Sequence, residues 1–294
     1  MEFQPLPSSP RTAGPDTRLG LALRVGFFAG TVFVLLRLLV LLLFSVFGFV
    51  VAGTVGLCAT GLFANLLTLR IFDRQPFSAI GLGLTRASAW NLAAGVLLGG
   101  GTAVLMLLAP ILAGSGSLVR QESPAFSWLN LGFYLVALAA AAGGEEMIFR
   151  GYAFQLLIAR IGPFATVLPV AVIFGLTHAS NPHASAIGVL NTILWGIVLG
   201  YAFLRSRDLW LPIGLHFGWN LVLPLFGVNL SGLTIDVTRY HYKWDLLPLW
   251  SGGDYGPEGG LLTTIFVIAL MFALMKAPLK PQYAVIAQNL NDMD

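Results

Sequence analysis

The chain has 294 residues, of which 57% are hydrophobic and only 10% are charged, and its formal net charge is +3. Soluble domains carry about 25% charged residues, so this chain cannot cover its surface with polar groups, and a water-soluble globular protein is excluded. Its single cysteine, Cys58, excludes an intramolecular disulfide. We therefore expect the lipid bilayer as its environment, and no nucleic acid as a partner.

Eight apolar blocks are long enough to cross a hydrocarbon core of about 30 Å as helices. They lie at 23–48, 50–69, 88–113, 130–149, 163–179, 185–204, 209–226 and 260–276. The expected fold class is therefore all-α, a polytopic bundle of about eight transmembrane helices. A count of seven stays open, because only the region from Gly48 to Gly53 separates the first two blocks.

The basic residues between the blocks are distributed unequally over the two sides of the membrane. With eight spans and the N-terminus inside, twelve lie on the inner side and three on the outer side, namely Arg120, Arg239 and Lys243. Because cytoplasmic loops carry an excess of Lys and Arg, we expect a multi-pass protein of the cell membrane with both termini in the cytoplasm. Arg37 falls within the first block, where an arginine is expected to snorkel or to face a neighbouring helix.

One membrane domain is expected at 21–280. Residues 1–20, rich in Pro, Ser and Thr, resemble a disordered cytoplasmic tail rather than a signal peptide, because the apolar run that follows is too long. Residues 281–294 are expected to form a second cytoplasmic tail.

Small and aromatic residues within the apolar blocks predict how the helices pack and where they meet the interface. The glycines from Gly95 to Gly101, with Gly196 and Gly200, favour close helix packing. Interfacial anchoring is expected of four tryptophans near block ends or in loops, namely Trp195, Trp210, Trp219 and Trp244.

Two adjacent carboxylates, Glu145 and Glu146, stand within an apolar block, followed by Arg150. An ionisable group at membrane depth costs several kcal/mol unless it is paired, so it suggests a functional site. Residues four apart share a helix face, so Glu146 and Arg150 are expected to pair. Glu145 then points about 100° away and is free for other chemistry.

Two more polar clusters follow in later blocks: His178 ends one, and His216 with Asn220, one helical turn apart, lies in another. A buried glutamate and a neutral histidine can share the proton of a water molecule, and His216 with Asn220 can donate hydrogen bonds to a developing oxyanion. These are the components of a hydrolase that activates water inside a bilayer. His183 is expected in a loop, and His241 is not expected to be catalytic.

The three clusters read EEMIFR at 145–150, FGLTH at 174–178 and HFGWN at 216–220. In this order they resemble the motifs EExxxR, FxxxH and HxxxN of the CPBP intramembrane proteases, which include the eukaryotic CAAX prenyl endopeptidase and bacterial bacteriocin-processing or self-immunity proteins. The resemblance covers about 128–226.

This resemblance implies a role for each motif residue. Glu145 would be the catalytic glutamate and His178 its proton-transfer partner. His216 and Asn220 would stabilise the oxyanion, and Glu146 with Arg150 would support the site. A membrane-associated protein or peptide would be the substrate, with no CAAX specificity implied.

Two other functions and one cofactor question stay open. A proton-coupled transporter could use the same glutamate and histidines as a relay, although the first half lacks a matching charged motif. A catalytically silent immunity or scaffold protein would also keep the fold. We favour a metal-free site, because the zinc-binding spacing HExxH does not occur in the sequence. The alternative is a zinc ion held by Glu145, His178 and His216.

Overall fold

The computed structural model describes residues 17–122, 126–282, 284 and 286. The predicted tail at 1–20 falls outside this range up to residue 16, and its last three residues belong to the first helix, which begins at Arg18. Of the predicted tail at 281–294, most residues also lie outside the described part. The expected all-α membrane bundle is confirmed.

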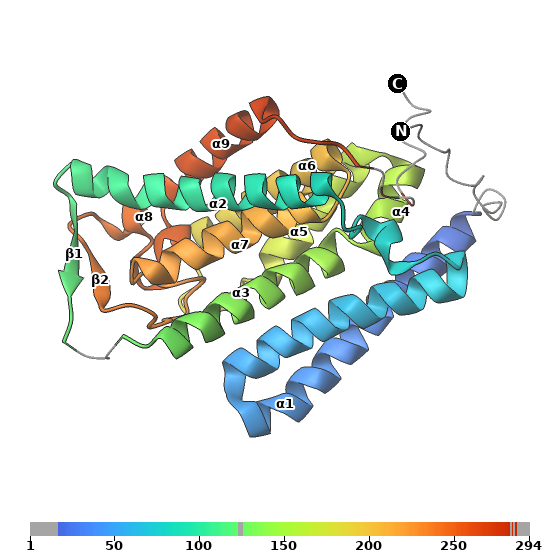
Figure 1. Cartoon of the computed structure of the whole chain (residues 1–294), viewed down its shortest axis with the longest axis horizontal. Helices are drawn as coiled ribbons and strands as arrows, with labels where there is room; N and C mark the ends of the chain where they lie inside the picture. The colour runs from blue at the N-terminus through green and yellow to red at the C-terminus, as the bar shows by residue number, and fades with distance from the viewer. Residues whose placement is uncertain (1–16, 123–125, 283, 285, 287–294) are drawn as a thin grey trace.

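Figure 1 shows the long helices running roughly along the longest axis of the molecule. The bounds of the helices are α1 Arg18–Thr68, α2 Arg86–Leu112, α3 Trp128–Phe149, α4 Tyr152–Ile161, α5 Pro163–Thr177, α6 Ala186–Ser206, α7 Trp210–Leu225, α8 Pro248–Ser251 and α9 Leu261–Lys276. Shorter turns are the π-helix η1 Leu69–Asp73 and the 3₁₀-helices η2 Phe77–Ile80, η3 Gly253–Tyr255 and η4 Pro257–Gly259.

Helix α1 is a hairpin rather than one rod. Gly48 adopts φ 75° and ψ 178°, a conformation open to glycine, and the two arms, 18–47 and 49–68, turn back on each other there (Figure 1). The break lies at the start of the Gly48 to Gly53 region, so the two predicted blocks are separate arms.

The number of full spans stays a prediction. By length and composition, four helical segments among the described residues can cross a membrane. The first is α1 with η1, the second is α2, the third is α3 with α4, and the fourth is α6. Helices α5, α7 and α9 have 15, 16 and 16 residues, which at 1.5 Å per residue is about 22–24 Å, short of the hydrocarbon core.

Helix α4 and one pair of strands were not predicted from the sequence. The chain breaks at Arg150 and Gly151 after α3, and the short amphipathic helix α4 begins beyond this break. Strands β1, Gly116–Arg120, and β2, Tyr240–Trp244, pair antiparallel with Gly116 opposite Trp244 at one end of the bundle (Figure 1).

Glycines bring α2 and α7 into close contact, as the Gly95 to Gly101 stretch predicted. A Cβ atom on Gly99 would lie 2.1 Å from the Leu215 carbonyl oxygen, and one on Gly95 would lie 2.5 Å from that of Leu211. Gly196 likewise approaches the Ala171 backbone on α5. These helices pack backbone to backbone, which fixes α7 within the bundle.

The predicted interfacial role of two tryptophans is wrong. Trp195 and Trp219 are 6% and 2% exposed, and their rings lie 4.9 Å apart in the core between α6 and α7. Each sits inside its helix rather than at an end.

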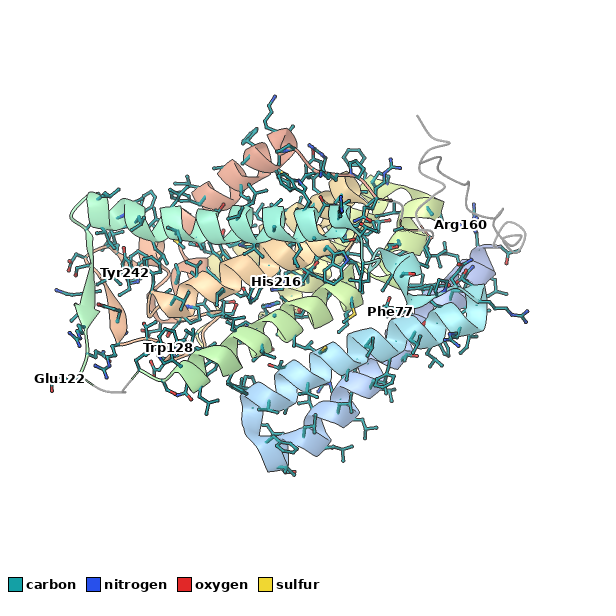
Figure 2. All side chains as sticks on the ribbon, in the orientation of Figure 1. Phe77, Glu122, Trp128, Arg160, His216 and Tyr242 are labelled. Carbon is teal, nitrogen blue, oxygen red and sulfur yellow. The ribbon has the colours of Figure 1, made fainter. Side chains whose placement is uncertain are left out.

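Basic residues in the described loops and strands lie at the two ends of the bundle. Figure 2 labels Arg160 and Phe77 at one end, Glu122, Trp128 and Tyr242 at the other, and His216 between them. The first end also gathers the loops after α1, α4, α6 and α9, joined by contacts such as the Gln282 amide to the Ser206 carbonyl. Arg120 and Lys243, on β1 and β2, lie at the second end, a distribution consistent with the predicted inner and outer sides.

Candidate active site

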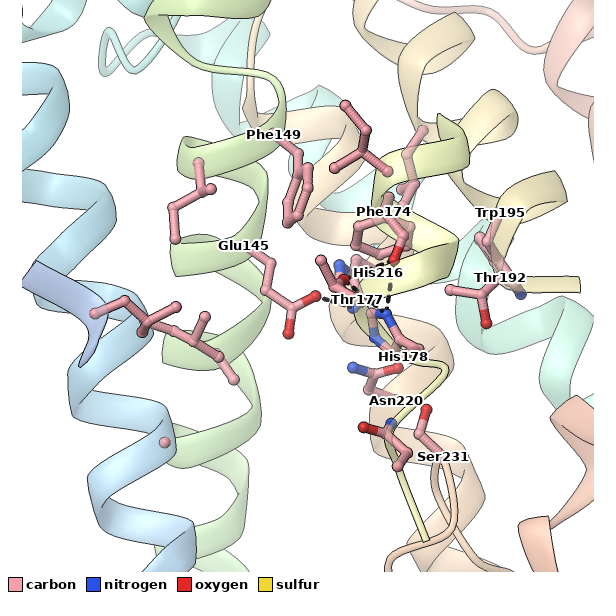
Figure 3. A pocket seen from close by; sticks show the side chains of 18 of the residues that line it. Glu145, Phe149, Phe174, Thr177, His178, Thr192, Trp195, His216, Asn220 and Ser231 are labelled. Carbon is pink, nitrogen blue, oxygen red and sulfur yellow. Dashed lines mark hydrogen bonds and ion pairs between the residues drawn. The ribbon is translucent and has the colours of Figure 1, made fainter. Parts of the chain in front are cut away.

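The three sequence motifs meet at one cavity of about 970 Å³. Glu145 comes from the last turns of α3, His178 caps the C-terminal end of α5, and His216 and Asn220 project from α7. All four side chains line the cavity, and Figure 3 shows the Glu145 carboxylate pointing toward the other three. Every residue predicted to be catalytic is therefore present at one place.

Glu146 and Arg150 form the expected pair. Both side chains are fully buried, and Arg150 Nη1 donates to Glu146 Oε1 over 3.1 Å. Nη2 of Arg150 donates to the Gly196 carbonyl oxygen on α6 over 3.0 Å. The guanidinium also lies 4.7 Å from the centre of the Phe174 ring. The pair thus connects α3 with α5 and α6 inside the bundle.

Glu146 has a second partner that the sequence did not predict. His216 Nδ1 lies 2.9 Å from the same oxygen, Oε1. A carboxylate oxygen only accepts hydrogen bonds, so Nδ1 carries a hydrogen and Nε2 faces away from Glu146. One buried carboxylate therefore orients both the arginine of the first motif and the histidine of the third.

Glu145 faces the cavity, as its position next to Glu146 predicted. Its Oε2 lies 3.9 Å from His216 Nε2, too far for a hydrogen bond, and its side chain is 17% exposed. Oε2 has no hydrogen-bond partner among the described residues although it is buried. Two contacts of about 2.8 Å can span 3.9 Å, so one water molecule fits against both atoms.

His178 is held by its own helix. Its Nδ1 lies 2.9 Å from the Phe174 carbonyl oxygen and 3.3 Å from Thr177 Oγ1. Because the carbonyl accepts, the neutral ring carries its hydrogen on Nδ1 and leaves Nε2 as an acceptor. The Phe174 ring lies 4.9 Å from the His178 ring and 6.1 Å from the His216 ring. The phenylalanine of the second motif thus packs against both histidines.

The remaining histidines are not part of this site. His183 adopts φ 58° in the loop after α5, and His241 lies exposed on β2. Neither lines the cavity.

A third carboxylate in the cavity, Glu258, was missed. Glu258 on η4 accepts from Trp219 Nε1 over 3.0 Å and from the Ser231 backbone amide and hydroxyl over 2.6 and 2.8 Å. Trp219 directly precedes Asn220, so this contact attaches the 227–259 loop to α7. The one sequence feature that could have indicated Glu258 is its set of flanking glycines, Gly256, Gly259 and Gly260. Glycines allow the backbone of a loop to approach a neighbouring element closely.

Asn65, on the second arm of α1, was also missed. Its amide donates to the Met147 carbonyl oxygen, and its Oδ1 accepts from the Tyr152 backbone amide, each over 2.8 Å. These two groups lie on either side of the break between α3 and α4. Asn65 therefore holds the end of the first motif in place from the N-terminal half of the chain.

The side chains that could ligate a metal are partly engaged by other groups. In the described part of the chain, no three His, Cys, Asp or Glu side chains converge closely enough to ligate one ion. His216 Nδ1 and His178 Nδ1 are already engaged by a carboxylate and a carbonyl. The arrangement instead offers one carboxylate and two imidazole Nε2 atoms around a space for water.

Comparison with known families agrees with the motif resemblance. Residues 127–222 match the family described as type II CAAX prenyl endopeptidase Rce1-like. The match covers α3 to most of α7, which is nearly the 128–226 region expected from the sequence. Among curated proteins, none matches this chain significantly.

Proposed function

We propose, starting from the membership of residues 127–222 in the CAAX protease family, that this membrane protein is an intramembrane endopeptidase. It hydrolyses a peptide bond of a membrane-associated protein or peptide. The observation that carries the proposal is the convergence of Glu145, His178, His216 and Asn220, from three helices, on one cavity in an apolar bundle. The family match alone does not show which side chains take part in the reaction.

The first step is the activation of water by Glu145. A water between Glu145 Oε2 and His216 Nε2 gives its proton to the carboxylate while its oxygen attacks the carbonyl carbon of the scissile bond. The free, buried Oε2 suits this role, because it has an unused acceptor in a place with little competing solvent.

His216 and Asn220 then stabilise the oxyanion of the tetrahedral intermediate. Donation from both ring nitrogens of His216 requires the doubly protonated ring. The site favours this form, since the positive ring sits between Glu146 at 2.9 Å and Glu145 at 3.9 Å. Asn220, one turn further along α7, adds a neutral amide donor.

Collapse of the intermediate breaks the carbon–nitrogen bond. The proton taken by Glu145 passes to the leaving nitrogen, and His178 Nε2 assists as a transient acceptor. The products are one carboxylic acid and one amine, which together contain all the atoms of the peptide bond and of the water consumed. Trp195 Nε1, buried in the cavity wall without an acceptor in the described residues, is available to hold a substrate carbonyl.

The site is proposed to face a substrate within the cell membrane. Apolar residues from both arms of α1 form much of the cavity wall, which suits a membrane-embedded peptide. We place both termini in the cytoplasm, because the end of the bundle that carries most basic residues is then inside.

Membrane proteomics in cells producing wild type or Glu145→Gln tests the proposal. A membrane peptide that accumulates intact with Glu145→Gln, and is cleaved with wild type, is the expected result. Glu122→Gln, a matched change at an exposed residue, should behave as wild type. Comparable size-exclusion profiles must show that both variants fold. A Glu145→Gln variant that still cleaves would refute the proposed base.

The same purified protein tests our proposal that the site works without metal. Activity should persist after treatment with phenanthroline, and elemental analysis should show less than one zinc per chain. Zinc whose removal stops turnover and whose return restores it would overturn this part and assign Glu145, His178 and His216 as ligands.

A further inference from the structure

Arg37 places a positive charge in the cavity wall, away from the catalytic motifs. It lies on the first arm of α1, is exposed, and lines the same cavity as Glu145. Its neighbours in the wall are apolar side chains of both arms, among them Phe33, Leu36 and Val50. Arg37 is therefore a cation in an otherwise apolar part of the cavity.

Arg37 was expected to snorkel or to face a neighbouring helix, and its side chain extends along its own helix. The guanidinium lies 5.6 Å from the centre of the Phe33 ring, one turn nearer the N-terminus. The closer end of this arm is the turn at Gly48, in the opposite direction. Arg37 thus extends away from the Gly48 turn, toward Phe33 on its own helix.

Helix contacts place Arg37 at about the level of the catalytic glutamate. A Cβ on Gly56 would lie 2.9 Å from Val40 and 3.7 Å from Leu36, so these positions on the two arms face each other. A Cβ on Gly144 would meet the backbone of Leu57 and Cys58 at 2.6 Å. The segment around Arg37 and the segment around Glu145 therefore contact the same turn of the second arm.

Arg37 has no acidic partner within ion-pair distance among the described residues. Arg24 and Arg150, also in helices of the bundle, pair with Asp73 and Glu146. A charge at membrane depth without a partner is unfavourable, and its partner is expected to be an anion that enters the site.

We propose that Arg37 and the apolar walls of the α1 hairpin bind a carboxylate carried on an apolar chain. A guanidinium matches a carboxylate through two parallel hydrogen bonds. One arginine neutralises a single negative charge, which favours a carboxylate over a phosphate monoester. The chain could be a fatty acid from the bilayer or an apolar peptide with a free C-terminus. If the proposed peptidase function holds, such a ligand occupies the substrate cavity, but its binding requires no catalysis.

Tryptophan fluorescence measures this binding without any substrate, because Trp195 and Trp219 line the cavity. Purified full-length protein in neutral detergent, at about pH 8, where carboxylates are ionised, is titrated with 9,10-dibromostearate or its methyl ester. We expect saturable quenching by the acid at a concentration about tenfold lower than by the ester. A second experiment adds a trileucine peptide, as free acid or as amide, to protein that has bound dibromostearate. Displacement of dibromostearate by the free-acid peptide would identify a peptide as the ligand.

Variants assign the preference to Arg37. Arg37→Gln should abolish the difference between acid and ester, and Arg37→Lys should retain most of it. Arg70→Gln removes an exposed cation outside the cavity and should behave as wild type. The proposal would be overturned if wild type bound the charged and the uncharged member of each probe pair equally. It would also be overturned if a folded Arg37→Gln protein still preferred the acid. Since Glu145→Gln should bind the acid normally, failure here is distinguishable from failure of the peptidase function.

Discussion

Replacement of Glu146 by Gln tests the role of the shared carboxylate. Glu146 Oε1 accepts from Arg150 over 3.1 Å and from His216 over 2.9 Å, and its side chain is fully buried. Glutamine has nearly the same shape but no charge. Both donors contact the same oxygen, Oε1, so the glutamine amide oxygen can still accept from both, and the substitution removes the charge rather than the hydrogen bonds. The substitution therefore leaves Arg150 buried without its counter-charge and removes the carboxylate next to His216.

The expected magnitude follows from the burial of the pair. Breaking a buried ion pair by removing one partner costs about 3–5 kcal/mol. With about 2–4 °C of Tm per kcal/mol in a chain of this size class, the apparent Tm should fall by roughly 6–20 °C. Thermal unfolding of purified protein in one detergent, at one scan rate, provides the measurement. Turnover should fall as well, because the doubly protonated His216 ring loses the carboxylate that lies 2.9 Å away.

Glu145→Gln is the matched control, since it makes the same chemical change at the adjacent residue. Glu145 has no hydrogen-bond partner at Oε2 and faces the cavity, so the apparent Tm should change by less than about 3 °C. Adding Arg150→Met to Glu146→Gln should recover part of the loss, because no charge then lacks a partner. Equal Tm shifts for the two Gln variants would refute the assignment of separate roles.

Two further predictions concern the bundle. Gly99→Ala should destabilise the protein by more than about 2 kcal/mol, because the new methyl group would meet α7 backbone, whereas Gly101→Ala, with open space around it, should be neutral; unfolding by heat distinguishes them, and equal effects would contradict the packing. In a Cys58→Ala background, an impermeant maleimide added to intact cells should label a cysteine at exposed Lys243 but not one at Ser78. The reverse pattern would invert the proposed orientation.

The sequence was informative wherever a feature depends on local spacing. Apolar length located the helices, and the spacing of four residues predicted the Glu146–Arg150 pair, which the structure shows at 3.1 Å. The same helical geometry predicted that Glu145 faces elsewhere. Glycine density indicated the close contact of α2 with α7. Each of these is set within one or two helical turns.

Features that depend on three-dimensional contacts were not predictable in this way. The hydrogen bond from His216 to Glu146 joins residues 70 positions apart, and no local pattern records that α7 packs on α3. Glu258 stands in a polar loop that does not resemble a membrane segment, yet the loop folds inward and Trp219 binds its carboxylate. Trp195 and Trp219 were misplaced for the same reason, because the sequence shows their position along a helix but not which face is buried.

The charges at the site explain how four ionisable groups can share an apolar bundle. Glu145 and Glu146 are balanced by Arg150 and, when doubly protonated, by His216, and the contacts of 2.9, 3.1 and 3.9 Å place each cation against a carboxylate. The resting site can thus be neutral overall. Transfer of a proton from water to Glu145 moves its negative charge to the attacking oxygen, which lies next to His216. Charge is therefore redistributed over a few ångströms without a new net charge in the membrane, and this keeps the cost of the reaction low in a medium of low dielectric constant.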